Sequence, residues 1–312
     1  MDVARPAPGH HLGIDLGGTN AKWSIVEHDV ETWRGIDRGT RPTTAGDGPD
    51  AVIDGLIELA RAAQQRRPDI ASVGVGIPGR YDPETGVAKF LPNFPGTWAG
   101  RPVAARISKA TGLPTALIND ARAFGLAELR LGAGRGARSL VGLTLGTGVG
   151  GVIAIDGRVY QGHDGAAGEF GHQTLVADGR PCTCGNVGCL EVYANANAVA
   201  QACGTASAES AVEAARAGDP TALAGLAEVG RCLGIGIANM ITAVTPDRVV
   251  IGGGVAAAGD LLLDPIRAEV ARRVRMTAVD AVTIVTAELG IWAGAMGAAV
   301  HGAEAAASVV AA

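Results

Sequence analysis

The segment LGIDLGGTN, residues 12–20, decides the fold, and LTLGTGVG, residues 143–150, repeats its plan later in the chain. Each segment begins with a buried apolar strand, passes through a glycine turn that carries a threonine, and resumes as a second strand. The pair Asp156-Gly157 then predicts a further tight hairpin turn. Two units of this kind indicate two halves of related construction that face each other across a cleft.

Strand-like and helix-like segments alternate through the rest of the chain. Buried strands are predicted at residues 70–77, 115–118 and 248–251, and helical spacing occurs at residues 52–60, 121–131, 193–244 and 260–274. This alternation predicts an α/β fold in which helices cover the sheets. The glycine-rich segment LGAGRG, residues 131–136, is the best candidate for a flexible junction between the halves.

Composition narrows the class of protein. The chain has 312 residues, of which 47% are hydrophobic, so it is long enough for two globular lobes with their own cores. A net charge of −5 and only 4% aromatic residues argue against a nucleic-acid surface. Residues 1–10 contain prolines and no apolar run, so we expect no signal peptide. The apolar tail, residues 291–312, predicts a packed helix and no membrane partner.

A compact group of cysteines and one histidine predicts a zinc site. Three of the five cysteines lie within eight residues, and the histidine lies ten residues upstream of the first: His172, Cys182, Cys184 and Cys189. Thiolates and imidazole are the ligands that a tetrahedral zinc ion prefers. The alternative is three buried cysteines and an unrelated histidine. Glu169 and Glu191 flank the group, so a metal here would hold a polar pocket in shape. No disulfide framework is expected, and a reducing cytoplasm fits.

The glycine turns predict phosphate contacts. In Asp15-Leu16-Gly17-Gly18-Thr19-Asn20 the glycines allow close backbone approach, and successive N–H groups can form an anion nest. Asp15 would repel phosphate unless it lies beside Mg²⁺, so we expect it to bind that ion through water. Gly146-Thr147-Gly148 repeats the pattern. Neither is a Walker loop, because the Gly-Lys-Ser/Thr ending is missing, and an ordinary hairpin turn is the alternative.

Asn119-Asp120 follows a predicted strand, at the end where α/β folds place functional groups. A carboxylate at this place can accept a proton from a hydroxyl nucleophile. Aspartate is also a good helix N-cap. The pattern alone leaves both roles for Asp120 open.

Taken together, these motifs resemble the ROK family (repressors, open reading frames and kinases) of sugar kinases. The matching elements keep the family order over nearly the whole chain, at residues 15–19, 119–121, 145–151, 168–172, 182–191 and 251–254. The resemblance implies a two-lobed actin/hexokinase-like (ribonuclease H-like) α/β fold that binds ATP and sugar in the cleft between the lobes. The implied small lobe contains residues 1–120 and a terminal helix at 292–312, and the large lobe contains residues 121–291. A homodimer or a higher homo-oligomer is also implied.

The resemblance assigns a role to each matching residue. It makes Asp120 the catalytic base, and its sugar contacts are Asn93, Asn119, Asp120, Glu169, His172 and Glu191. The implied contacts to ATP and Mg²⁺ are Asp15, Gly17, Gly18, Thr19, Asn20, Gly146, Thr147, Gly148, Gly252, Gly253 and Gly254. The implied ligands of a structural Zn²⁺ are His172, Cys182, Cys184 and Cys189. The chain departs from the family at Arg122, where asparagine is common, and at Asn195, where serine is common.

The implied activity is ATP-dependent phosphorylation of a hexose at its 6-hydroxyl, with glucose as the expected sugar. N-acetylmannosamine, N-acetylglucosamine, mannose and fructose stay open as substrates, and polyphosphate stays open as a second donor. Family members that bind DNA carry a helix-turn-helix before the first phosphate turn, which here begins at Asp15, so we do not expect a repressor. A zinc-ribbon interaction module would use two Cys-x-x-Cys knuckles, and this chain has one compact cluster.

Overall fold

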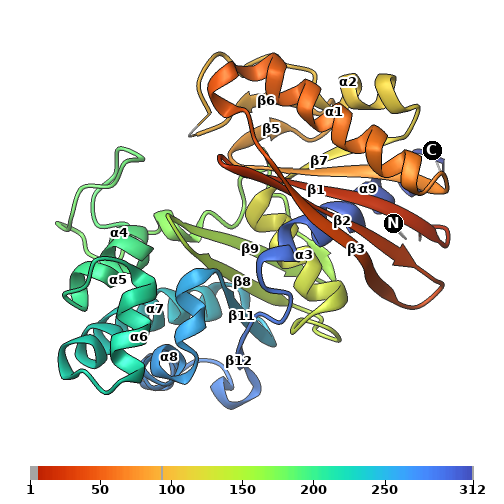
Figure 1. Ribbon diagram of the computed structural model, residues 1–312. Coiled ribbons are helices and arrows are strands. Elements are labelled where there is room, and N and C mark those ends of the chain that lie inside the picture. Colours follow the sequence, from red (N-terminus) through yellow and green to blue (C-terminus); the bar gives the residue numbers. More distant parts are fainter. Residues whose placement is uncertain (1–5, 93, 311–312) are drawn as a thin grey trace. The chain divides into compact units, whose positions relative to one another are not determined.

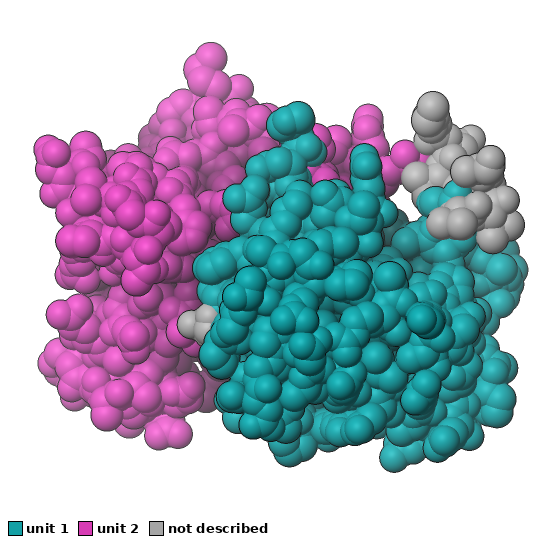
Figure 2. All heavy atoms as spheres, turned by 90° about the horizontal axis from the view of Figure 1, so that it is seen from above, with its two compact units in different colours: residues 1–132, 162–166, 291–312 teal, residues 133–161, 167–290 magenta. Residues whose placement is uncertain are grey.

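The computed structural model describes residues 6–92 and 94–310, and the chain divides into two compact units (Figures 1 and 2). Unit 1 is formed from residues 1–132, 162–166 and 291–312, and unit 2 from residues 133–161 and 167–290. The first crossing between the units falls within the glycine-rich segment 131–136. The functional lobes expected from the family resemblance, divided at residue 120, stay a prediction.

Unit 1 is built on a five-stranded sheet in the order β3-β2-β1-β4-β7. Its strands are β1 (Gly9–Leu16), β2 (Asn20–His28), β3 (Trp33–Pro42), β4 (Ile70–Ile77) and β7 (Thr115–Asn119). Its helices are α1 (Pro49–Arg66), α2 (Val103–Thr111), α3 (Asp120–Leu131) and α9 (Ala293–Val310), and a small second sheet pairs β5 (Arg80–Asp82) with β6 (Val87–Phe90). Strand β2 pairs antiparallel with both β3 and β1, and β1, β4 and β7 run parallel to one another.

The two faces of this sheet differ in side-chain size. On β1 and β4 the large side chains, such as Leu12 and Val75, join the core that includes α1. The glycines between them face α9, since a Cβ on Gly13 would overlap Ala295 O and one on Gly74 would overlap Ala298 O. The alternation of small residues along 70–77 therefore marks the strand face on which a helix backbone rests.

Unit 2 repeats the sheet of unit 1, in the order β10-β9-β8-β11-β12 with the same sequence of antiparallel and parallel pairs. Its strands are β8 (Leu140–Leu145), β9 (Val149–Ile155), β10 (Arg158–Val159), β11 (Arg248–Gly252) and β12 (Thr283–Thr286). Its helices are α4 (Glu191–Ala194), α5 (Ala196–Ala202), α6 (Ala208–Arg216), α7 (Pro220–Val244) and α8 (Asp260–Arg273). Short 3₁₀ turns of unit 2 are η2 (Phe170–His172), η3 (Gly254–Ala258) and η4 (Val279–Ala281); η1 (Ala45–Asp47) belongs to unit 1, and η5 (Gly290–Trp292) lies where the chain returns to unit 1.

Helix α7 is the central helix of unit 2. Among the described residues it is the helix that is long and apolar enough to span a membrane, but 61% of its most apolar window is buried inside the structure. Its glycines admit close neighbours: a Cβ on Gly230 would press on Pro265 of α8, and one on Gly225 would press on Ala202. The apolar surface of α7 is therefore largely the core surface of this unit.

The alternating elements predicted from the sequence are confirmed. Strands β1, β2, β4, β7, β8, β9 and β11 lie where apolar runs were found, and the turn at Asp156-Gly157 has the positive φ angles, 51° and 72°, of a tight hairpin. The edge strand β3 was not expected from the sequence. Its half-exposed pattern lacks the continuous apolar run that marked the central strands.

Gly13→Ala should destabilise unit 1, because the new methyl group overlaps the backbone of α9 and the helix must move away from the sheet. We expect a loss of about 3 kcal/mol or more in unfolding free energy, at the upper end of overpacking costs. Gly55→Ala is the matched control. It lies inside α1 with no atom near the added Cβ, so it should stabilise by about 0.5–1 kcal/mol. Denaturant unfolding checks both, and equal stability of the two variants would contradict the packing argument.

Candidate functional site

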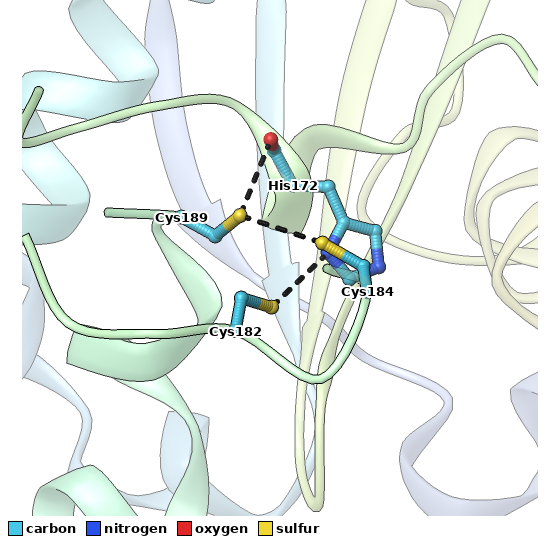
Figure 3. Close-up of side chains that lie close together, drawn as sticks. All are labelled: His172, Cys182, Cys184 and Cys189. Carbon is cyan, nitrogen blue, oxygen red and sulfur yellow. Dashed lines mark hydrogen bonds between the residues drawn. The ribbon is translucent and has the colours of Figure 1, made fainter. Parts of the chain in front are cut away.

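The histidine and the three cysteines singled out in the sequence lie together in unit 2 (Figure 3). One ligand atom from each of them falls within 4.8 Å of every other: His172, Cys182, Cys184 and Cys189. Cys182 and Cys189 are buried, His172 is half-buried, and Cys184 is exposed. The structure therefore brings together the whole predicted ligand set.

Local backbone geometry explains how so short a segment converges. The N–H of Cys182 donates to Asn186 O at 2.8 Å, and the N–H of Gly185 donates to Cys182 O at 3.0 Å. Gly185 and Gly188 have φ angles of +94° and +71°, in the left-handed region that favours glycine. These turns fold the segment back on itself and direct the three sulfurs to one side.

The distances fit a tetrahedral metal. Cys184 Sγ and Cys189 Sγ lie 3.7 Å apart, and Cys182 Sγ lies 3.8 Å from His172 Nδ1. A disulfide would need about 2.05 Å, whereas Zn–S bonds of about 2.3 Å place two sulfurs of a tetrahedron about 3.8 Å apart. Since Nδ1 faces the cysteines, Nε2 of His172 is the ring nitrogen left for another partner.

The thiols of this cluster differ in acidity. Burial, helped by the neighbouring sulfurs, raises the pKa of the Cys189 thiol to about 12, and the backbone N–H of Asn186 lowers the pKa of Cys184. Cys189 therefore keeps its proton at neutral pH unless a metal displaces it. Metal binding at such a site releases protons.

The second glycine turn lies beside the cluster's flanking segments. Gly146–Gly148 connects β8 to β9, and Thr147 at its tip is exposed. The loop at Gly252–Gly254 approaches the same place, because a Cβ on Gly253 would overlap the backbone of Leu145. Gly253 also has a φ angle of +86°, so both the backbone conformation and the lack of space for a Cβ favour glycine there. Two of the three predicted phosphate loops thus meet at the end of β8.

Glu191 and Glu169 lie on opposite sides of the cluster in the sequence and differ in their contacts. Glu191 opens α4, and its Oε2 accepts the N–H of Val149 at 2.9 Å. Its Oε1 lies 3.9 Å from Cys182 Sγ. Glu169 is exposed and precedes the 3₁₀ turn η2, and its carbonyl oxygen accepts the N–H of His172 at 3.0 Å. No pattern in the sequence pointed to the backbone amide of Val149 as a partner of Glu191.

The first glycine turn lies in unit 1 between β1 and β2. The N–H of Gly17 donates to Asn20 O at 3.2 Å, and Gly18, Thr19 and Asn20 are exposed. Asp15 is the second-last residue of β1, shortly before this turn, and burial raises its pKa. Lys22 lies opposite in the hairpin, with its Nζ 3.8 Å from the Asp15 carboxylate. Pairing the residues of the two strands outward from the turn would have placed Lys22 opposite Asp15.

Asn119 caps helix α3, and Asp120 occupies the first helical position. The Asn119 Oδ1 accepts the N–H groups of Ala121 and Arg122 at 3.1 and 3.3 Å, and its Nδ2 donates to Gly79 O at 3.2 Å. Asp120 Oδ1 also accepts the Ala121 N–H, at 2.8 Å. Because Asn119 is the N-cap, capping does not account for the presence of an aspartate at 120.

The two departures from the family pattern, Arg122 and Asn195, lie on a buried face of α3 and at the start of α5. Arg122 is 2% exposed on α3, and its charge lies close enough to Tyr81 to oppose the burial that raises the pKa of that phenol to about 12. Asn195 caps α5, with its Oδ1 accepting the Ala198 N–H at 2.8 Å. Serine is an equally good N-cap, so asparagine keeps this role. Asn93, expected on the sugar side, lies outside the described residues.

Comparison with known proteins places this chain in a family. The model of the ROK family matches residues 11–303. The chain belongs to the ROK family. A glucokinase of Thermotoga maritima is 35% identical over 307 residues, which cover 92% of this chain and 95% of that protein.

Two solved ROK structures share the fold. A ROK family glucokinase from Streptomyces griseus, in complex with glucose and AMPPNP, is 32% identical with a TM-score of 0.77, covering 93% of this chain and 98% of its own. A ROK hexokinase from Thermus thermophilus is 34% identical with a TM-score of 0.79, covering 94% and 97%. The predicted α/β fold of the actin/hexokinase type is confirmed.

The purified protein should contain about one zinc ion per chain, because three thiolates and one imidazole complete a tetrahedron. Cys184→Ala should lose most of that zinc, and because this side chain is exposed the variant should leave the core undisturbed. Cys232→Ala, a buried cysteine of α7 outside the cluster, is the control and should keep its zinc. Elemental analysis of protein purified without chelator measures both. Absence of zinc in the unaltered protein would contradict the site.

Proposed function

We propose that this protein is an ATP-dependent glucokinase that transfers the γ-phosphoryl group to the 6-hydroxyl of glucose. The observation that carries the proposal is the near full-length similarity to the T. maritima glucokinase, 35% identity over 92% of this chain. The glucose and AMPPNP complex of the S. griseus relative supports the same substrate pair. The acidic and imidazole groups around the cluster in unit 2 support a polyhydroxylated ligand.

In this proposal Asp120 is the general base. Its carboxylate takes the proton of the 6-hydroxyl as that oxygen attacks the γ-phosphorus in line, and the β–γ bridging oxygen leaves with ADP. Asn119 fixes the start of α3, since its amide both caps the helix and donates to Gly79 O. Asn119, and not Asp120, therefore holds the start of the helix on which Asp120 lies.

The glycine turns would hold the phosphates through backbone N–H groups. The exposed tips at Thr19 and Thr147 add hydroxyl donors. Magnesium in kinases usually takes only one or two protein carboxylates, and Asp15, directly before the first turn, fits that need. When bound, Mg²⁺ neutralises the charge that develops on the transferring group.

Sugar hydroxyls would be held by Glu169, His172 and Glu191. Zinc on Nδ1 of His172 would fix the ring tautomer and leave the Nε2–H as a donor to a hydroxyl. The four cluster residues fit zinc by donor type and spacing, so the metal's part here is to hold this loop in one geometry.

Asp120→Asn should remove most phosphoryl transfer while sugar binding changes little, because asparagine keeps the shape and loses the basicity. A general base contributes roughly 10²–10⁴-fold, so single-turnover rates should fall by that order. Asp219→Asn at the start of α7 is the control, since either residue caps a helix and the activity should not change. Near-normal turnover in Asp120→Asn would rule out this base.

Glu169→Ala should lower kcat/KM for glucose at least tenfold, because a hydrogen bond to a charged group contributes about 1.5–3 kcal/mol and 1.4 kcal/mol is one factor of ten. Glu213→Ala, an exposed glutamate on α6, should leave kcat/KM unchanged. A coupled assay over glucose, mannose, fructose, N-acetylglucosamine and N-acetylmannosamine measures the preference. A higher kcat/KM for another sugar than for glucose would overturn the glucose assignment and leave the kinase assignment in place.

A further inference from the structure

Val149, the first residue of β9 directly after the second glycine turn, is held from two sides by the segments that carry the metal ligands. Its carbonyl oxygen faces the backbone of Gly171, and its N–H faces the carboxylate of Glu191. Gly171 precedes His172, and Glu191 lies two residues after Cys189. One residue of β9 is therefore clamped between the two halves of the metal cluster.

The contact at Gly171 depends on the absence of side chains. A Cβ on Gly171 would overlap Val149 O, and one on Gly151 would overlap Gly168 O. Gly168 has a φ angle of +93°, which favours glycine. The strand β9 and the segment that delivers His172 thus lie backbone against backbone, and a shift of one is felt by the other.

The contact at Glu191 is polar and directed. Its Oε2 accepts the Val149 N–H at 2.9 Å and would lie 2.5 Å from a Cβ on Gly148, so the carboxylate fills the space beside the turn. The segment is anchored at its start by Leu190, whose N–H donates to Gln173 O at 3.0 Å. Further along, the Ala196 N–H donates to Gly146 O at 2.8 Å. The segment that follows Cys189 therefore contacts both ends of the turn. Ala196 binds Gly146 at its start, and Glu191 binds Val149 just after it.

We propose that occupancy of the Cys/His cluster by zinc sets the geometry of the second phosphate turn, Gly146–Gly148, with Glu191 as the positioning residue. An ion bound to His172 and Cys189 at once cross-links the two segments that hold Val149. Metal removal leaves the two segments joined by weaker contacts, such as the hydrogen bond from Leu190 N–H to Gln173 O, so they move more freely and the turn loses the fixed N–H directions that bind phosphate. The inference rests on the proposed function only in naming a nucleotide as the ligand of this turn.

The first glycine turn provides an internal control. In the part of the chain that the structure describes, it lies in unit 1 and is closed by its own hydrogen bond from Gly17 N–H to Asn20 O at 3.2 Å. It is further held by the Thr43 N–H, which donates to Thr19 O at 2.8 Å. All four cluster residues belong to unit 2, so the metal should act on one turn and leave the other unchanged.

The experiment compares zinc-loaded protein with protein stripped by a chelator that is then removed by desalting. Amide hydrogen exchange is measured at Val149, Ala196 and Gly17, and the Kd of ADP is measured by calorimetry. Stripping should speed exchange at Val149 and Ala196 at least tenfold, weaken ADP about tenfold, and leave Gly17 unchanged. Re-addition of Zn²⁺ should restore both values.

Two substitutions separate positioning from general loosening. Glu191→Ala in zinc-loaded protein should reproduce the faster exchange at Val149 and the weaker ADP binding. Glu191→Gln keeps an amide oxygen that can accept the Val149 N–H, so exchange and ADP affinity should stay within about twofold of the unaltered protein. If Glu191 acted only through its charge, Glu191→Gln would show the same faster exchange and weaker ADP binding as Glu191→Ala, and this result would contradict the positioning role.

Equal exchange at Val149 with and without zinc would overturn the coupling, as would failure of added Zn²⁺ to bind. The exchange measurement needs no sugar and no turnover. Loss of kinase activity toward every sugar would therefore contradict the proposed function. The coupling between the metal and the turn would still be decided by the exchange measurement. A protein whose exchange responds to zinc but whose ADP affinity does not would overturn the part of the inference that concerns the nucleotide.

Discussion

Direct contact between backbones, at positions where a side chain would not fit, is the constraint on which both units depend. In unit 1 it seats α9 on β1 and β4 at Gly13 and Gly74, and in unit 2 it seats the His172 segment on β9 at Gly171. It also brings Gly253 against the end of β8, where two glycine loops meet. Such contacts leave little room for adjustment, because neither partner has a flexible side chain to move. Part of the high glycine content of the chain, 47 of 312 residues, serves this purpose.

The sequence predicted the central strands and the long helices because their signals are local. A continuous apolar run between glycine turns can be read without knowledge of the partner, and β4 began and ended at the predicted residues. The edge strand β3 and the small sheet of β5 and β6 were missed, since their half-exposed residues carry no apolar period. The assignment of α3 to unit 1 was also beyond the sequence. It follows from the packing of Gly297 of α9 against Ala123, a contact across more than half of the chain.

The candidate site shows the same division. The cysteines and His172 could be found from spacing and donor chemistry, and the structure brings them within reach of one ion. The choice between base and cap at Asp120 could not be made from the sequence, because both roles use the same residue type at the start of a helix. In the structure Asn119 is the N-cap of α3, and no pattern in the sequence indicated this. The role of Val149 was invisible for a different reason: it acts through its backbone amide, and any residue type would supply one.

The repeated strand order has a consequence for how such a protein can diverge. In both units a crossover connects the end of the antiparallel strands to the fourth strand of the sheet, but the connection is short in unit 1, residues 43–69, and long in unit 2, residues 160–247. In each connection a long helix comes directly before the fourth strand, α1 in unit 1 and α7 in unit 2, but the cysteine cluster and α4 to α6 have no counterpart in the shorter connection. The two units therefore share one sheet plan, and unit 2 carries its cysteine cluster in the additional stretch inserted in the long connection. Selection on that inserted stretch can alter ligand preference while the two sheets are inherited unchanged.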